Sequence, residues 1–307
     1  MRWLLLALSL ALPAQARVLA VGPGQEFDSP SRAVRAAAAH DTVLIEPGTY
    51  YHCAVATVPL TIEGHGPGVV LTDKTCEDKA ILVLRGGSMV VRNLTLARAR
   101  VGDGNGAGIR MEGDGLLAEH VVFDNDEVGI LSGGMGPVQV RDCTFQDGGV
   151  GGERPLAALF VGPAAALTVE RSRFAAIRGA QVSSGAAMTT ISESTFDTGA
   201  EARGLDVHGA LLMQGNTLTA GPAAAAGMVR VDGPGPVTLR QNRFIGRVML
   251  QDWTGGTPVL ENNELSPGAE AVSTEGVWRH RASAALHGAK DGARAVAGQV
   301  KHGVLGR

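Results

Sequence analysis

The sequence is poor in aromatic residues, which make up 4% of its 307 positions, and in charged residues, which make up 19%. The high share of apolar residues, 45%, together with this low share of charged residues, excludes a largely disordered chain. Glycine does not recur at every third position, which excludes a collagen triple helix. Glycine is nevertheless abundant, at 43 residues, and predicts a chain that turns often rather than a helical bundle.

Cysteine is scarce as well, with only Cys53, Cys76 and Cys143 in the chain. An odd number of cysteines allows at most one internal disulfide when all three belong to one chain. No two of them have the CxxC spacing that is typical of structural zinc sites. The sequence therefore gives no reason to expect a zinc centre.

Long hydrophobic runs are missing too, since a membrane-spanning helix takes about 20 apolar residues. The apolar run Leu4–Leu12 is shorter, follows Arg2 and precedes the small-residue segment Ala14–Ala16. These are the features of a secretory signal peptide. We therefore expect residues 1–16 to be a signal peptide, the mature chain to begin near Arg17, and the protein to be exported to the periplasm or the cell exterior.

Positive charge is concentrated at the C-terminus. Residues 277–307 hold six Lys or Arg residues and one acidic residue, so that the rest of the chain, whose overall net charge is −3, is acidic. An acidic body argues against a nucleic-acid partner. We interpret 277–307 as a basic C-terminal cap or tail, in which Trp278 would close the end of the fold.

A short pattern recurs along most of the chain: alternating apolar residues, a polar stretch, and a final Phe or Leu. These final residues lie 21–29 positions apart. They are Leu96, Phe123, Phe145, Phe174, Phe196, Leu218, Phe244 and Leu265. Between the copies runs a second short alternating strand that mostly ends at glycine. Units of this length predict a parallel β-solenoid, in which each strand pairs with its copy one coil away. A leucine-rich repeat is excluded because the fixed positions also accept Val, Ile, Met and Phe.

The position two residues before each of these final residues is also informative, since it turns polar along the chain. Its occupants are Leu94, Val121, Cys143, Ser172, Ser194, Asn216, Asn242 and Asn263. Stacked about 4.8 Å apart, such side chains can form a hydrogen-bonded ladder. Cys143 is therefore predicted to be a buried member of this ladder rather than a nucleophile.

Three N-terminal segments carry a resemblance to a known fold family. They are SPSRAVRAAAAHD at 29–41, TVLIEPGTY at 42–50 and LTIEGHG at 60–66. They resemble the opening of right-handed parallel β-helix proteins of the pectate-lyase-like superfamily, which includes lyases, hydrolases, esterases, epimerases and adhesins. The resemblance implies an all-β fold, a right-handed parallel β-helix of about nine or ten coils over 17–276 with an N-terminal capping helix that Ser29 caps. His65 then belongs to a glycine turn.

A second resemblance narrows the first. The segment 103–131 is similar to uncharacterised exported bacterial β-helix repeat proteins. On the following coils this chain has Ala157, Ala158 and Gly204 where that group carries polar residues. Since Cys53 and Cys76 flank the first coil that matches the superfamily well, and export permits oxidation, we predict a disulfide between them.

The outward positions of the second strand should form two parallel rows. The first row is Val83, Arg110, Leu131, Phe160, Ser183, Asp206, Arg230, Met249 and Ser273, and the second is Arg85, Glu112, Gly133, Gly162, Gly185, His208, Asp232, Gln251 and Glu275. His208 beside Asp232 can be a general base, but ion pairing across a solvated sheet is the interpretation we favour. Exposed Phe160 would suit a sugar ring; the alternative is coverage by a neighbouring loop.

The loops before these strands are rich in oxygen ligands. They contain Asp103, Asn105, Asp124, Asn125, Asp126, Glu127, Asp147, Glu153 and Arg154. Because they enter consecutive coils, they should gather at one edge of the sheet, where carboxylates can bind Ca²⁺ or act on a glycosidic bond. The alternative is a solvated loop edge. No cofactor is required by the sequence, and Ca²⁺ is the one cofactor that these residues suit.

These observations favour an exported protein that engages a polysaccharide or cell-surface glycan along the sheet, with lyase or hydrolase activity as an extension. The catalytic candidates are Arg110, Glu112, Asp124 and Asp126, and the substrate-binding candidates are Asp103, Asn105, Phe160 and Arg154. We expect a monomer with no membrane span. The alternative is a non-catalytic structural or adhesive solenoid.

Overall fold

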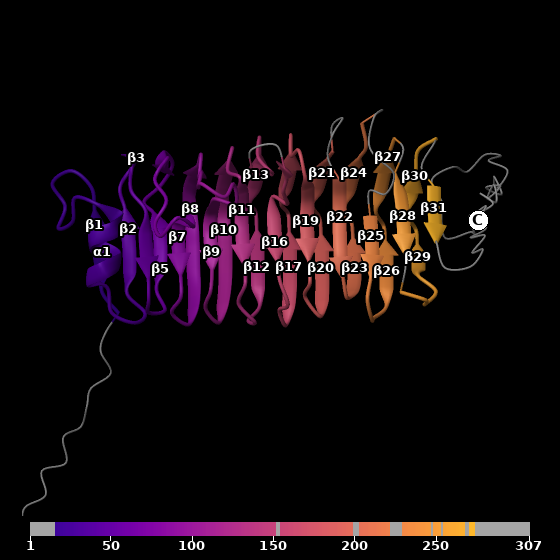
Figure 1. Cartoon of the computed structure of the whole chain (residues 1–307), viewed down its shortest axis with the longest axis horizontal. Helices are drawn as coiled ribbons and strands as arrows, with labels where there is room; N and C mark the ends of the chain where they lie inside the picture. Colours follow the sequence, from indigo (N-terminus) through magenta and orange to yellow (C-terminus); the bar gives the residue numbers. More distant parts are fainter. Residues whose placement is uncertain are drawn as a thin grey trace, which may run out of the picture.

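Short strands wind around one long axis in the computed structural model, which describes residues 16–151, 154–198, 203–221, 229–246, 248–252, 254–267 and 270–273 (Figure 1). The predicted signal peptide lies outside these residues except for Ala16. The predicted C-terminal cap with Trp278, together with Glu153 and Glu275, also lies outside them. These boundaries therefore stay predictions.

Each coil contributes strands to three parallel ladders, which we call the first, second and third faces. The first face consists of β1 (Val18–Val21), β2 (Thr42–Ile45), β5 (Thr61–Gly64), β8 (Ser88–Ala97), β10 (Gly115–Asp124), β12 (Val138–Arg141), β17 (Ala166–Glu170), β20 (Met188–Ser192), β23 (Ala210–Gln214), β26 (Val237–Arg240) and β29 (Val259–Glu261). The second face consists of β3 (Gly48–Tyr50), β6 (Val69–Thr72), β13 (Thr144–Gln146), β18 (Arg173–Ala175), β21 (Thr195–Asp197), β24 (Thr217–Thr219), β27 (Arg243–Ile245) and β30 (Glu264–Leu265), joined by the ends of β8 and β10.

The third face is a separate sheet of ten strands, one from each coil. It consists of β4 (Ala54–Ala56), β7 (Ala80–Leu84), β9 (Ala107–Met111), β11 (Val128–Ser132), β16 (Leu159–Val161), β19 (Ala180–Ser184), β22 (Arg203–His208), β25 (Val229–Asp232), β28 (Met249–Asp252) and β31 (Glu270–Ser273). A small antiparallel pair, β14 (Val150–Gly151) and β15 (Arg154–Pro155), protrudes from one loop. The predicted all-β parallel β-helix of about ten coils is thus confirmed.

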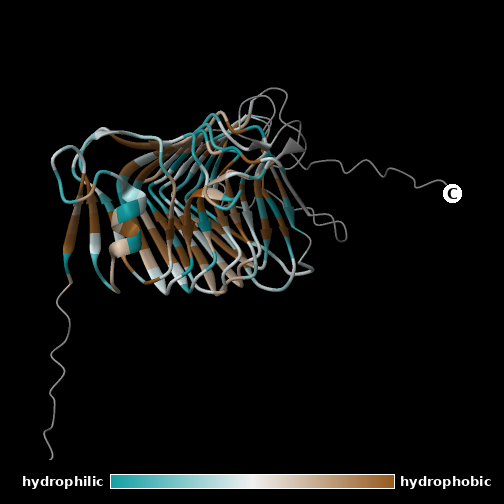
Figure 2. Ribbon diagram, turned by 60° about the vertical axis from the view of Figure 1, so that its left-hand side comes forward, coloured by the Kyte–Doolittle hydropathy of each residue, from teal (hydrophilic) through white to brown (hydrophobic). Residues whose placement is uncertain are grey.

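The helix α1 (Pro30–Ala36) lies at the N-terminal end of the stack, as Figures 1 and 2 show. It buries Ala33 and Val34 and packs on β1, β2 and β4. Pro30 opens the helix, where its missing N–H costs nothing. Ser29 occupies the N-cap position, but its hydroxyl donates to Asp28 Oδ1 at 3.0 Å and makes no cap hydrogen bond. The predicted role of Ser29 as a capping side chain is therefore wrong.

Apolar side chains from all three faces fill the interior, so that hydrophobic colour runs along the strands of successive coils (Figure 2). Seven of the eight repeat residues are buried in this core. Leu265 is the exception at 37% exposure, because it lies on the two-residue strand β30, which pairs with Phe244 on one side only within the described ladder. The predicted inward stack therefore extends from Leu96 to Phe244.

A polar ladder runs inside the corner between the first and second faces. Asn216 Nδ2 donates to Asn242 Oδ1 at 2.9 Å, and Asn242 Nδ2 donates to Asn263 Oδ1 at 3.0 Å. The same oxygens also accept backbone N–H groups of the preceding coil. In earlier coils the hydroxyls of Ser172 and Ser194 accept such backbone N–H groups. These bonds satisfy buried corner groups that would otherwise lack partners. The predicted ladder is therefore confirmed.

Cys143 continues this ladder towards the N-terminus. Its backbone N–H donates to Ser172 Oγ at 3.1 Å, and its side chain is a free, buried thiol. Burial raises the pKa of the Cys143 thiol to about 12, which keeps it protonated at neutral pH. A protonated, inaccessible thiol is a poor nucleophile, as the repeat position predicts.

The residue before each ladder member has a left-handed backbone. Non-glycine residues with this conformation recur once per coil, at Asn93, His120, Asp142, Arg171, Glu193, Gln241 and Asn262, and Gly215 has it as well. This conformation turns the chain sharply from the first face to the second. Asn and Asp tolerate the left-handed conformation better than most residues, whereas Arg and Glu adopt it here at some cost in conformational energy.

Candidate functional face

The outer surface of the third face carries one row of side chains that is in register from coil to coil. Strand pairing aligns Val55, Val83, Arg110, Leu131, Phe160, Ser183, Asp206, Arg230, Gln251 and Val272. The predicted row is reproduced from Val83 to Arg230. Successive members lie about 4.8 Å apart along the axis, so that the row from Arg110 to Arg230 spans about 24 Å.

The last two members of the predicted row are wrong. Arg230 pairs with Gln251 rather than Met249, and the next position is Val272 rather than Ser273. Gln251 therefore leaves the second row, to which it had been assigned. The change from Met249 to Gln251 is a shift of two residues, which keeps the same side of the strand and which alternation alone does not detect. The change from Ser273 to Val272 is a shift of one residue, so Ser273 had been assigned to the wrong side of its strand.

The N-terminal part of this row is covered. Val83 is buried outside the main core, in a small cluster with Ala80, Ala107 and Val128. Cys76 and Leu156, from two different loops, pack against this cluster. Farther along the row the coverage ends, and Phe160 is 41% exposed. The open surface of the third face thus begins near the middle of the stack.

Glu112 is the centre of an ion-pair cluster at the covered end. Its Oε1 accepts a hydrogen bond from Lys79 Nζ and its Oε2 accepts one from Arg85 Nε, both at 2.8 Å. Arg110 Nε lies 3.5 Å from Glu112 Oε1, and Arg85 also pairs with Glu77. We call these five residues the Glu112 cluster. Three cations face two carboxylates, which leaves one positive charge in excess.

The carboxylates of this cluster are held ionised. Partial burial would raise the pKa of Glu112, but the hydrogen bonds from Lys79 and Arg85 outweigh it and lower that pKa below its ordinary value. The hydrogen bond from Arg85 likewise lowers the pKa of Glu77. Glu112 is therefore poorly suited to donate a proton at neutral pH and well suited to hold cationic side chains in place.

Glu77 and Lys79 were not predicted to belong to this cluster. Their loop follows Cys76, whose sulfur forms a disulfide with Cys53 at 2.02 Å, with Cα atoms 5.5 Å apart. The disulfide expected between these two cysteines is thus present, and it fixes the loop against the third face. The acidic and basic residues at 77–79 were a visible signal, but their position beside Glu112 depends on a turn that the disulfide and backbone hydrogen bonds of Cys76 and Lys79 hold.

A second group of charges lies farther along the same face. His208 Nδ1 lies 2.6 Å from Asp232 Oδ1, Arg230 donates to Asp232 Oδ2 at 3.2 Å, and Arg230 lies 3.9 Å from Asp206. The predicted neighbours are therefore correct. The His208 side chain is well exposed, as are both partners of the Asp206–Arg230 pair. Exposed pairs of this kind contribute about 0–1 kcal/mol each, which fits the interpretation as ion pairing on a solvated sheet.

The loop acids gather at one edge, as predicted, but two of their carboxylates point inward. Asp126 is 3% exposed, and its Oδ1 accepts the Ala99 N–H at 2.8 Å. Glu127 is also buried, and its Oε2 accepts the N–H groups of Val101 at 3.1 Å and Gly106 at 2.7 Å. These two side chains therefore hold the backbone of the loop between β8 and β9.

The remaining loop candidates lie near this edge. Asp124 ends β10 and accepts a hydrogen bond from Gln146 Nε2 at 3.1 Å, while exposed Asp103 accepts one from Asn105 Nδ2 at 3.0 Å. Arg154 is placed by its backbone on β15, opposite Gly151. The loops meet through their backbones, since a Cβ added at Gly151 would lie 1.5 Å from the Gly104 oxygen. Glycine is therefore required at this close approach.

The four catalytic candidates do not form one constellation. Asp124 and Asp126 precede β11, whereas Glu112 follows β9, and these strands run parallel and in register. A strand of five residues therefore separates the two ends, a distance of about 16 Å. Arg110 and Glu112 are together, while Asp126 is sealed beneath the loops. Paired carboxylates in glycoside hydrolysis lie about 5–9.5 Å apart.

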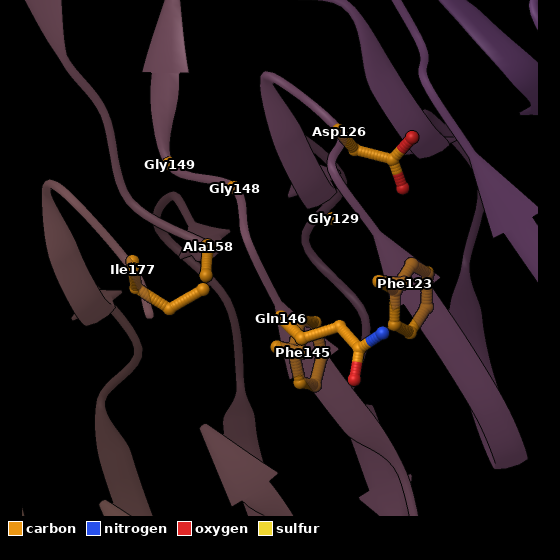
Figure 3. Close-up of a pocket in the computed structure, with 9 residues that line it drawn as sticks. All are labelled: Phe123, Asp126, Gly129, Phe145, Gln146, Gly148, Gly149, Ala158 and Ile177. Atoms are coloured by element: carbon orange, nitrogen blue, oxygen red, sulfur yellow. The ribbon is translucent and has the colours of Figure 1, made fainter. Parts of the chain in front are cut away.

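A small cavity lies beneath the loop edge (Figure 3). Its lining consists of Phe123, Asp126, Gly129, Phe145, Gln146, Gly148, Gly149, Ala158 and Ile177. The space open to the centre of a water molecule is about 10 Å³, roughly what one water needs by this measure. A sugar residue does not fit there. This cavity is therefore not a polysaccharide site.

The same residues bear on metal binding. Within the described parts of the chain, no three His, Cys, Asp or Glu side chains converge in a way that would hold a metal ion. Two of the carboxylates that the sequence offered to Ca²⁺, those of Asp126 and Glu127, are buried and accept backbone N–H groups instead of facing solvent. The same parts of the chain also contain no helix long and apolar enough to cross a membrane.

Comparison with solved structures bears on the fold. The PL6 family alginate lyase AlyGC matches with a TM-score of 0.54 and 14% identity, over 84% of this chain and 37% of that chain. The two proteins share the parallel β-helix fold. This β-helix chain thus spans 37% of the length of the alginate lyase.

Two pectin methylesterases also match. The enzyme from carrot has 13% identity over 84% of this chain and 82% of its own, with a TM-score of 0.46. The enzyme from Aspergillus niger has 11% identity over 86% of this chain and 87% of its own, with a TM-score of 0.44. No family model matches the β-helix chain, and no curated protein is similar to it.

Proposed function

We propose that this is an exported β-helix protein that binds an acidic polysaccharide on the open part of its third face. The observation that carries the proposal is the position of Phe160. Its ring is 41% exposed in the outward row, two strands from Arg110 of the Glu112 cluster. An exposed ring beside fixed charges suits a sugar polymer, since the ring stacks on the apolar face of a sugar and the charges orient its polar groups.

The surface around Phe160 is low enough for a polymer to lie on it. Gly133, on the neighbouring coil, is exposed, and a Cβ added there would meet nothing within 4 Å. Ser183, on the other side of Phe160, is small and half-buried. Along the row itself, Phe160 lies between Leu131 and Ser183, which are both half-buried, so that a chain of sugars can follow the row.

The charge of the Glu112 cluster favours an acidic polymer. Its three cations outnumber its two carboxylates, and Arg110 lies in the outward row itself. The alginate lyase that shares the fold acts on a polyuronate, which makes polyuronates the first ligands to test. An acidic ligand would pair with the excess positive charge, and that contribution would weaken with salt.

Binding fits the geometry better than cleavage. A hydrolase needs two carboxylates on opposite sides of one glycosidic bond, and here Glu112 is about 16 Å from the Asp126 end of the strand. Asp126 is buried, and Glu112 is engaged by two cations at 2.8 Å. Lyase or hydrolase activity, with Arg110 and Glu112 as the accessible members of the catalytic set, is the alternative that a product assay tests.

The test is a binding screen of the mature chain against polyuronates and neutral glucans. We expect binding to an acidic polymer, a loss of at least about tenfold in affinity for Phe160→Ala, and no change for Tyr51→Ala. Tyr51 is the matched control because its ring is 62% exposed and lies outside the outward row. Release of new sugar ends during the assay would favour the enzymatic alternative. Absence of binding to every polymer would overturn the proposal in favour of a structural or adhesive solenoid.

A further inference from the structure

A buried carboxylate next to the first strand accepts four hydrogen bonds. Asp41, between α1 and β2, accepts the backbone N–H of Arg17 on Oδ1 at 2.8 Å. Its Oδ2 accepts Arg17 Nε at 3.1 Å, Arg17 Nη2 at 2.6 Å and the Ala38 N–H at 2.8 Å. Asp41 is 2% exposed, whereas the Arg17 side chain is 59% exposed. One residue therefore binds the buried carboxylate through both its backbone and its side chain.

The position of Arg17 is fixed by the sheet as well. Its carbonyl accepts the Thr42 N–H at 2.8 Å, and the next residue, Val18, pairs with Thr42 in the β1–β2 ladder. Arg17 Nη2 also donates to the Ala36 carbonyl at 3.2 Å. The contacts of the Arg17 carbonyl and of its guanidinium thus hold the Arg17 backbone nitrogen at Asp41.

We infer that hydrolysis of the Ala16–Arg17 peptide bond creates the mature N-terminus and that Asp41 is the site built to receive it. In this step a peptidase adds water across the bond, so that Ala16 leaves with a carboxylate and Arg17 keeps an α-ammonium group. The nitrogen that already lies 2.8 Å from Asp41 Oδ1 then carries a positive charge. This inference rests on the proposed export and is independent of the polysaccharide ligand.

The charge on that nitrogen changes the strength of an existing contact. In the uncleaved chain the nitrogen is a neutral amide, and only the guanidinium neutralises Asp41. After cleavage the same atom becomes a charged donor, which adds a Coulomb attraction to its existing hydrogen bond with the ionised Asp41 carboxylate. Glu26 is the other carboxylate that acts on Arg17, through space and more weakly than Asp41. Processing therefore strengthens an Arg17–Asp41 contact that is already present in the uncleaved chain.

Titration of the Arg17 α-amine makes the stability gained from this contact depend on pH. Hydrogen bonds from Arg17 hold the pKa of Asp41 at about 2, so that this carboxylate stays ionised. An α-amine beside it has a pKa above its ordinary value of about 7.7. The stabilisation is complete below that ordinary value and is lost as the pH rises through the raised one.

The experiment compares two chains that start at Arg17, one with a free α-amine and one with an acetylated α-amine. Acetylation keeps an N–H for Asp41 but removes the charge. We expect the free form to melt at the higher temperature at pH 7, and the difference to vanish by pH 11. An α-amine pKa at its ordinary value in the free form, read by labelling across pH, would overturn the inference without any mutation.

Two controls complete the test. Asp41→Asn should abolish the melting difference between the free and acetylated forms and return the α-amine to its ordinary pKa, whereas Glu26→Gln should change neither. If Asp41→Asn does not fold, the pKa measured in the unmutated chain still decides. Sequencing of the exported protein should find Arg17 first; an exported chain that begins elsewhere, or one that is never processed, would also contradict the inference.

Discussion

The rings of Phe145 and Phe174 are stacked with centroids 4.5 Å apart and planes 3° from parallel. The two residues are also paired in the second face, between β13 and β18. The distance between the rings nearly equals the distance between hydrogen-bonded strands, about 4.8 Å. The row continues to Phe123 on one side and Phe196 on the other, so that one Phe in each of four consecutive coils makes ring contacts that match the backbone ladder.

The first prediction concerns this row. Phe174 is fully buried and contacts a ring on each side, so Phe174→Ala should lower the free energy of unfolding by about 3–5 kcal/mol. Phe174→Leu is the matched control, because Leu96 and Leu218 occupy the same position in other coils. It should cost less than half as much. Equal losses for the two variants, measured by urea unfolding, would contradict the expectation that a leucine side chain can fill this position in the Phe174 coil.

The second prediction concerns the polar ladder. Asn242 Oδ1 accepts the Asn216 N–H at 3.0 Å, and Asn242→Ala would leave that buried N–H without an acceptor, at a cost of about 1–3 kcal/mol. Asn242→Ser should cost less, since the Ser194 hydroxyl serves as such an acceptor two coils earlier in this ladder. Thermal unfolding of both variants checks this order. A serine variant no more stable than the alanine variant would contradict it.

The fold could be predicted because it repeats. The spacing of residues such as Phe145 and Asn242 reports the coil length, and every coil obeys the same rule. The pairs that were predicted wrongly are those whose register the repeat does not determine. The pairing of Arg230 with Gln251 differs from the predicted pairing by two residues, a shift that alternation does not detect.

The candidate site was less predictable, because its residues are brought together by contacts that the repeat does not encode. Lys79 reaches Glu112 because a disulfide positions its loop. Asp126 and Glu127 satisfy backbone N–H groups inside the loop edge instead of facing solvent. A polar residue in a loop can do either, and its identity alone does not distinguish the two. The direction of such side chains depends on the loops above them.

The third prediction concerns the disulfide. The bond between Cys53 and Cys76 links residues 23 positions apart, and its removal should cost about 3 kcal/mol in the chain-entropy description. The double variant Cys53→Ser with Cys76→Ser tests this by urea unfolding. It should also weaken polysaccharide binding, because the loop that carries Glu77 and Lys79 is released. Cys143→Ser, which removes the free thiol and keeps a ladder side chain, is the control and should leave binding unchanged.

The fourth prediction concerns the buried carboxyl group of Asp126. Burial raises its pKa well above the ordinary value, and its Oδ2 has no hydrogen-bond partner in the described protein. Below about pH 4 the group is protonated in both the folded and the unfolded chain. Above that pH the unfolded chain ionises first, so the folded state loses up to about 1.4 kcal/mol per pH unit until the raised pKa is reached.

Asp126→Asn should therefore match the unmutated protein near pH 4 and exceed its stability at pH 7. The amide oxygen still accepts the Ala99 N–H, and the group no longer titrates. Asp126→Leu, which removes that acceptor, should be less stable than the asparagine variant at both pH values. Unfolding free energies of the three proteins across pH check this order, and a constant difference between Asp and Asn would show that the carboxyl does not titrate in this range.

The last prediction separates binding from catalysis on the third face. Arg110 lies in the outward row and its side chain is 27% exposed, so that the exposed part of this side chain can contact an acidic sugar. Arg110→Gln should weaken binding of a polyuronate by about tenfold and reduce the dependence of affinity on salt, because one cation no longer contacts the polymer. Asp206→Asn, which changes an exposed ion pair on the same face, should leave both quantities unchanged.

Glu112→Gln completes this comparison. It removes a carboxylate that repels an acidic polymer, so a protein that only binds should keep its affinity or gain some. An enzyme that uses Glu112 as a base would instead lose product formation while still binding. Affinity by calorimetry and product release by reducing-end assay, measured on the same three variants, therefore distinguish the two. Loss of binding in Glu112→Gln, with the melting temperature unchanged, would contradict an electrostatic attraction between the polymer and the excess positive charge of the Glu112 cluster.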